Sequence, residues 1–136
     1  MAYCDFTLPD IQRQLHCIIA ATTDLFVSVG EVQGSPGLHE ALRETLPLAL
    51  AVHTEKSRSK LLIAPILVEL RKLAQYQVSL FSGIDFSVAP GQGLNGVCDC
   101  IVSQSPKQLL VSAPVLLIIE AKNENIKGAW RNVLLP

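Results

Sequence analysis

Two short segments carry residue types and a spacing that could do chemistry. Asp99 lies in a strand-like segment, and Glu120-Ala121-Lys122 closes the most apolar run of the chain, residues 114–119. Since the side chains of a β-strand alternate with period two, Glu120 and Lys122 share one face. If the two strands pair, two carboxylates and one amine converge. Carboxylates in this arrangement hold a divalent cation, and such a cation activates a bound water.

The strands that must position these residues fill the carboxyl-terminal half of the chain. Segments 78–81 and 84–88 alternate apolar and polar residues, and Gly83 between them predicts a bulge or a bend. The next two strands, which carry the candidate residues, cover 94–103 and 115–121 and have the composition of strands. We therefore expect a three-strand antiparallel meander.

Helical periodicity precedes these strands. Apolar residues recur at three- and four-residue spacing over 38–50, where Pro47 predicts a kink or a break. Thr54 followed by an acid predicts a helix N-cap, and a wide apolar stripe runs from there to about Tyr76. Pro65 lies inside this second helix and should bend it. Helices followed by strands give an α+β fold class.

The composition bounds the domain organisation. At 136 residues the chain is one domain with its own core, and it has no internal repeat. Hydrophobic residues make up 49% of the chain and charged residues 17%, which favours buried strands, an interface, or both. The net charge of −1 gives no overall attraction to nucleic acid. The longest apolar stretch, 109–119, is too short to span a membrane.

Nothing in the sequence indicates export. No basic stretch precedes an apolar core near the amino terminus, so we expect a cytoplasmic protein without a secretory signal. The cysteines show neither the spacing of a disulfide framework nor that of a zinc site, and we expect them to be reduced and buried. They are Cys4, Cys17, Cys98 and Cys100.

The order of these elements resembles a known family. The chain resembles the PD-(D/E)xK nuclease superfamily in its order of elements. A helix and a strand come first, then a strand bearing Asp99, and then a strand ending in Glu120 and Lys122. The closer resemblance is to a group of cyanobacterial proteins related to restriction-endonuclease subunits. The Glu-x-Lys motif alone is weak, because charged pairs end many strands, but three blocks occur in the family's order. These blocks are residues 54–67, 94–99 and 119–126.

The resemblance implies a restriction-endonuclease-like fold, with N-terminal helices packed on a mixed sheet built on the antiparallel meander. The similar region covers about 36–127 of a single domain, 1–136. Residues 1–35 carry no clear pattern beyond a helix start near Pro9, and 128–136 form an atypical tail.

The implied activity is hydrolysis of DNA phosphodiester bonds with Mg²⁺ or Mn²⁺, in a restriction or repair context. Asp99 and Glu120 would bind the metal, and the carbonyl of Ala121 could supply a further oxygen ligand. Lys122 would position or activate the attacking water and stabilise charge on the phosphate.

An acid from the preceding helix often completes such a site. Glu55 is the first candidate for this ligand and Glu69 the second, although Glu69 could simply face solvent.

Each candidate also has an ordinary structural explanation. Asp99 could be a turn or surface residue, and Glu120 with Lys122 could form a cross-strand ion pair, which is worth little at a surface. Glu55 could simply place a charge at a helix N-terminus. The basic residues of the second helix fit a solvated face better than a DNA groove. These residues are Arg58, Lys60, Arg71 and Lys72.

The chain departs from the family at two places. Cys98 stands where the superfamily often has a proline, which is a minor departure. After Lys122 such proteins usually continue into a helix, often bearing a glutamine, and then into further strand. We therefore expect a truncation, for example by a frameshift, that leaves one apolar sheet face partly uncovered. A homodimer could bury that face.

Three functions remain open at this stage. The first is a metal-dependent DNA nuclease, which the intact acidic and basic residues favour. The second is a catalytically silent nuclease fold, kept for nucleic-acid binding or assembly, and the third is a truncated product without activity. No other catalytic motif competes, because the chain lacks a Gly-x-Ser-x-Gly motif and a P-loop.

Overall fold

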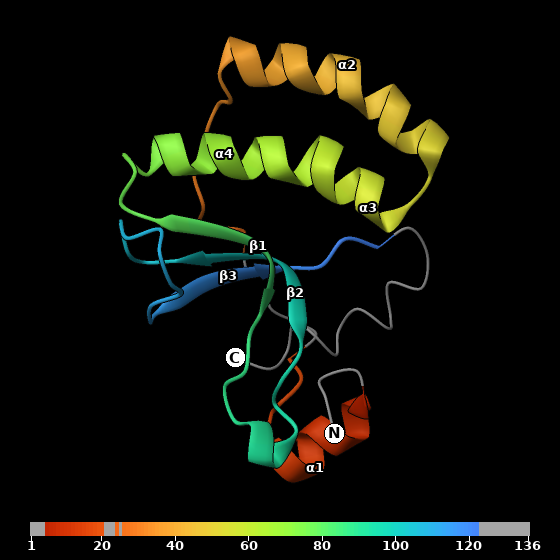
Figure 1. Ribbon diagram of the computed structural model, residues 1–136, viewed down its shortest axis with the longest axis vertical. Helices are drawn as coiled ribbons and strands as arrows, with labels where there is room; N and C mark the ends of the chain where they lie inside the picture. Colours follow the sequence, from red (N-terminus) through yellow and green to blue (C-terminus); the bar gives the residue numbers. More distant parts are fainter. Residues whose placement is uncertain (1–4, 21–23, 25, 123–136) are drawn as a thin grey trace.

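Within the described residues, the helices between residues 36 and 73 lie over one side of a three-stranded sheet, whereas the first helix and the short 3₁₀ helix at 90–92 lie at the far end of the molecule (Figure 1). The structure, a computed structural model, describes residues 5–20, 24 and 26–122. The elements in chain order are α1 (Leu8–Leu15), α2 (Pro36–Val52), α3 (Glu55–Arg58), the π-helical η2 (Ser59–Ile63), α4 (Ala64–Leu73), β1 (Ser79–Asp85), the 3₁₀-helical η3 (Pro90–Gln92), β2 (Val97–Ser103) and β3 (Val115–Ile119).

The sheet is the predicted antiparallel meander, with strand order β1-β2-β3. The α+β class is therefore confirmed. Both strand pairings within the described residues are antiparallel, so the mixed sheet that we expected is not seen there. The atypical tail at 128–136, and any helix that follows the Glu-x-Lys motif, lie outside the described residues.

The predicted strand boundaries need some correction. The two segments around Gly83 form one strand, β1, as the three-strand meander requires, and the ladder with β2 has no bulge at Gly83, which adopts a φ of +62°. β1 begins at Ser79, one residue after the predicted start. Residues 94–96 and 86–88 lie outside the strands, although the Val88 amide still donates to the Leu94 carbonyl. β3 ends at Ile119, two residues before the predicted boundary.

The first long helix, α2, begins at a side-chain N-cap and contains a proline, Pro47. The Ser35 side chain accepts a hydrogen bond from the Leu38 amide, and Pro36 occupies the first turn, where its missing N–H is no loss. A kink or a break was expected at Pro47, and the helix continues through this residue, so the break is wrong. The predicted N-cap at Thr54 is confirmed, with its side chain accepting from the Ser57 amide.

A proline shapes the second helical run, α3-η2-α4. Pro65 has no N–H, so the Leu61 carbonyl, four residues earlier, loses its α-helical donor. The helix widens into the π-helical segment η2 directly before Pro65. The Thr45 hydroxyl of α2 donates to the Leu61 carbonyl at 2.7 Å. The Leu61 carbonyl, which has lost its helical donor, thus accepts a hydrogen bond that joins α2 to the second helical run.

Two apolar clusters hold the elements together. One lies between α4 and the sheet and is built on Leu67, Cys100 and Val102. The other joins α1 to the connection between β1 and β2 through Ile11 and Leu94. No helix of the described residues is long and apolar enough to cross a membrane.

The cysteines within the described residues are free thiols. Cys98 and Cys100 are buried, as predicted, whereas Cys17 is half-buried, and Cys4 lies outside the described residues.

We expect Thr45→Val to lower the free energy of unfolding by about 1–2 kcal/mol, because the Leu61 carbonyl would lose its donor while the side-chain volume stays similar. Thr45→Ser keeps the hydroxyl and should recover most of the difference. Urea denaturation of the three proteins measures the effect. Equal destabilisation by valine and serine would contradict the role of this hydrogen bond.

Candidate active site

The pairing of β2 with β3 brings the two predicted segments together. Cys100 lies opposite Ile119 in the ladder, and one further step along this register places Asp99 opposite Glu120. The Ala121 amide donates to Asp99 Oδ2 at 2.8 Å. The Asp99 carboxylate therefore holds the backbone between Glu120 and Lys122.

Lys122 links two of the predicted acids. Its Nζ lies 3.7 Å from Glu55 Oε2 and 4.0 Å from Glu120 Oε2. The Glu120 side chain is only 5% exposed, whereas 47% of the Glu55 side chain is exposed. A nearly buried carboxylate needs a positive partner, and Lys122 supplies one. The structure thus gathers residues from β2, the end of β3 and α3.

Arg58 also belongs to this region, which the sequence analysis did not recognise. Its Nη1 donates to the Lys122 carbonyl at 2.9 Å, and its Nη2 lies 3.2 Å from His53 Nδ1. Arg58 is half-buried, so its assignment to a solvated helix face was wrong. The available signal was its position three residues after Glu55, which puts both side chains on one helix face. Arg58 fixes the backbone that carries Lys122.

Glu69, the second candidate for a helix ligand, lies elsewhere and does not face solvent. It is buried in α4, where its Oε1 accepts from the Ser35 amide at 2.7 Å and its Oε2 lies 3.9 Å from Lys72 Nζ. The hydrogen bond from Ser35 lowers the pKa of Glu69. Glu69 therefore serves as the hydrogen-bond acceptor for the backbone amide at the start of α2.

A cavity of about 380 Å³ opens beside Asp99 and Glu55. Its walls come from α3, η2, β1 and β2. The other lining residues are Lys56, Ser59, Lys60, Ser82 and Gly83. The space lies next to both a carboxylate of the sheet and a carboxylate of the helix, so a small polar ligand can reach either one.

Negative charge gathers at this end of the sheet. Burial, followed by the carboxylates of Glu120, Asp99 and Asp85, raises the pKa of the Cys98 thiol to about 11. Burial also raises the pKa of Cys100. The carboxylates that add to the effect of burial would also favour a cation near them.

Asp99 and Glu120 fit a hard divalent cation in part. Mg²⁺ binds through one or two carboxylates and keeps several of its waters, so it needs no dedicated protein cage. Among residues 5–20, 24 and 26–122, no three His, Cys, Asp or Glu side chains gather closely enough to hold a metal ion. The observed partner of Glu55 is Lys122, and the observed contact of Ala121 is made by its N–H. Metal ligation by Glu55 and by the Ala121 carbonyl stays a prediction.

Comparison of the chain with models of protein families, with curated proteins and with solved structures finds no match. Any statement about nuclease activity therefore depends on the residues themselves.

We expect Asp99→Asn and Asp99→Ala to differ in stability. The asparagine oxygen can still accept from the Ala121 amide, so this variant should unfold within about 1 kcal/mol of the native protein. Alanine leaves a buried amide without its acceptor and should cost about 1–3 kcal/mol. Urea denaturation separates the two cases. Equal stability of the alanine and asparagine variants would show that this hydrogen bond does not hold the site.

The raised pKa of Cys98 predicts a loss of stability in alkali. The folded protein keeps the thiol protonated up to about pH 11, whereas the unfolded chain releases the proton near pH 9.0. Because the unfolded state then binds fewer protons, the free energy of unfolding should fall between these two pH values. Cys98→Ala should make this decline shallower than in the native protein, whereas Cys17→Ala should not. A decline of equal slope in all three proteins would contradict the assignment.

Proposed function

We propose that the chain is a metal-dependent phosphodiesterase of the PD-(D/E)xK type that acts on DNA with Mg²⁺ or Mn²⁺. The observation that carries the proposal is the juxtaposition at the end of β3. There Lys122 lies 4.0 Å from Glu120, and Asp99 binds the amide of the residue between them. A restriction-endonuclease-like core around the observed meander belongs to the same proposal.

Asp99 and Glu120 would hold the cation. When bound, such an ion polarises a phosphoryl oxygen and lowers the pKa of a coordinated water. Burial of the Glu120 side chain, of which 5% is exposed, favours this use, because few waters compete for its oxygens.

Lys122 would orient the attacking water and balance charge on the phosphate. An ammonium group has three donors, and its two carboxylate neighbours leave at least one for a substrate oxygen. Arg58 acts as a positioning residue, since it binds the Lys122 carbonyl and does not reach the substrate through that contact.

The remaining expectations also belong to the proposal. A cytoplasmic location fits the free thiols of Cys17, Cys98 and Cys100. A homodimer would cover an exposed apolar side chain of β3, Leu116, which is 53% exposed.

One observation favours a catalytically silent module as the second candidate. Lys122 is already flanked by Glu55 and Glu120, which is also what a purely structural ion-pair network would look like. Such a protein would bind nucleic acid or a partner without cutting DNA.

Cleavage of DNA decides between the two candidates. We expect the native protein to cut plasmid or oligonucleotide DNA with Mg²⁺ or Mn²⁺ and to stop when EDTA is added. Asp99→Asn, Glu120→Gln and Lys122→Gln should each slow cleavage by about 100-fold or more, the scale of losing one group that stabilises a transition state. Glu40→Gln and Lys107→Gln are the matched controls on exposed residues outside the site, and they should cut at the native rate. Absence of cleavage with both metals, or cleavage that survives the site substitutions, would overturn the nuclease proposal.

A further inference from the structure

Two lysines outside the proposed catalytic set line the cavity beside Asp99. Lys56 comes from α3 and Lys60 from η2, four positions later along the same helical run. Both side chains belong to the lining of one cavity. The two ammonium groups can therefore approach one ligand.

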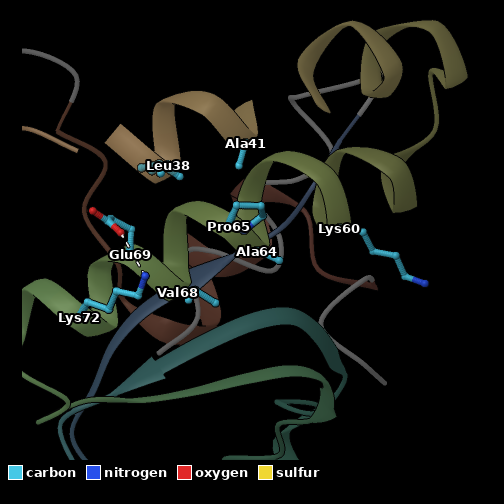
Figure 2. A pocket seen from close by; sticks show the side chains of 9 residues that line it. Leu38, Ala41, Lys60, Ala64, Pro65, Val68, Glu69 and Lys72 are labelled. Carbon is cyan, nitrogen blue, oxygen red and sulfur yellow. Dashed lines mark ion pairs between the residues drawn. The ribbon is translucent and has the colours of Figure 1, made fainter. Parts of the chain in front are cut away.

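The π-helical segment begins at this cavity. The first two residues of η2, Ser59 and Lys60, both contribute to the cavity wall. Lys60 also borders a second cavity of about 350 Å³ between α2 and α4. Figure 2 shows its side chain extending away from the other labelled residues of that second cavity, with its ammonium group at the far end.

The two lysines differ from the basic residues that serve the fold. Lys72 lies 3.9 Å from Glu69 at the opposite side of the second cavity, as the dashed line in Figure 2 marks. Lys122 is flanked by two carboxylates. Within the described part of the chain, neither Lys56 nor Lys60 has an acidic side chain within 4.0 Å, so both ammonium groups are available to an anion.

The cavity is lined by residues of both charges. Lys56 and Lys60 are basic, and the hydroxyl residues Ser59 and Ser82 also belong to the lining. Glu55 on α3 and Asp99 on β2 are acidic, and Glu55 lies 3.7 Å from Lys122. A ligand that brings anionic oxygens to the lysines and a cation to the carboxylates matches both kinds of charge. Phosphate groups accompanied by a divalent cation have this chemistry.

We propose that Lys56 and Lys60 form a binding subsite for consecutive phosphate groups of a nucleic-acid strand. The identity of the bond that is cut next to Asp99 depends on the proposed function, whereas binding of the strand by the lysines does not. The subsite accounts for how a chain of net charge −1 could retain a polyanion, because a local pair of lysines can act where the overall charge gives no attraction.

Strand binding without cleavage tests this subsite. The assay uses full-length protein carrying Asp99→Asn, a fluorescent single-stranded oligonucleotide, EDTA and a series of salt concentrations, with binding read from fluorescence anisotropy. Adding Lys56→Ala and Lys60→Ala together should weaken binding about 10-fold or more and reduce the salt slope by about 1.4, because two phosphate contacts to a single strand are lost. The matched control adds Arg43→Ala and Lys107→Ala, which removes two exposed positive charges elsewhere, and should change the affinity less than about 2-fold.

Three outcomes would overturn the subsite. An equal loss in the control would show that only net charge matters, and unchanged binding in the lysine variant would show that the strand lies elsewhere. Displacement of the strand by a free mononucleotide at an equal phosphate concentration would assign the cavity to a small phosphorylated ligand.

The failure of this inference is distinguishable from failure of the nuclease proposal. Lysine-dependent binding by a native protein that cuts no DNA would support the subsite and reject the activity. Metal-dependent cleavage with lysine-independent binding would reject the subsite and leave the activity intact.

Discussion

The hydrogen bond from the Ala121 amide to Asp99 holds the candidate site in place. β3 ends at Ile119, so the backbone that carries Glu120 and Lys122 is no longer held by the sheet ladder. Asp99 takes over as the acceptor for that backbone at 2.8 Å. From the other side, Arg58 binds the Lys122 carbonyl at 2.9 Å. These two contacts fix the segment between β2 and the helices, and every proposed function of its side chains depends on them.

The helical side of the site depends on a second backbone constraint. Pro65 removes a donor from the Leu61 carbonyl, the helix widens into a π-helical segment, and Thr45 of α2 satisfies the acceptor. The widened segment begins beside the cavity and brings Lys60 to its wall. A residue that is costly inside a helix thereby leaves a carbonyl that joins two helices through a hydrogen bond.

The sequence predicts the parts of the site that follow from local rules. The period-two alternation places Glu120 and Lys122 together, and strand composition predicts the pairing that brings Asp99 to them. The places of Glu69 and Arg58 were missed because each depends on a partner far away in the chain. Glu69 binds the Ser35 amide 34 residues away, and Arg58 binds the Lys122 carbonyl 64 residues away. The spacing from Glu55 indicates the helix face of Arg58, but no local pattern records the partner of either residue.

Calorimetric titration with Mg²⁺ and Mn²⁺ tests the central claim most directly, since it needs no knowledge of the substrate. The account predicts that the native protein binds one ion at millimolar concentrations or below. It predicts that Asp99→Asn and Glu120→Gln each abolish this binding, whereas Glu40→Gln leaves it unchanged. Native protein that binds neither metal at millimolar concentrations, or site variants that bind as tightly as the native chain, would contradict it.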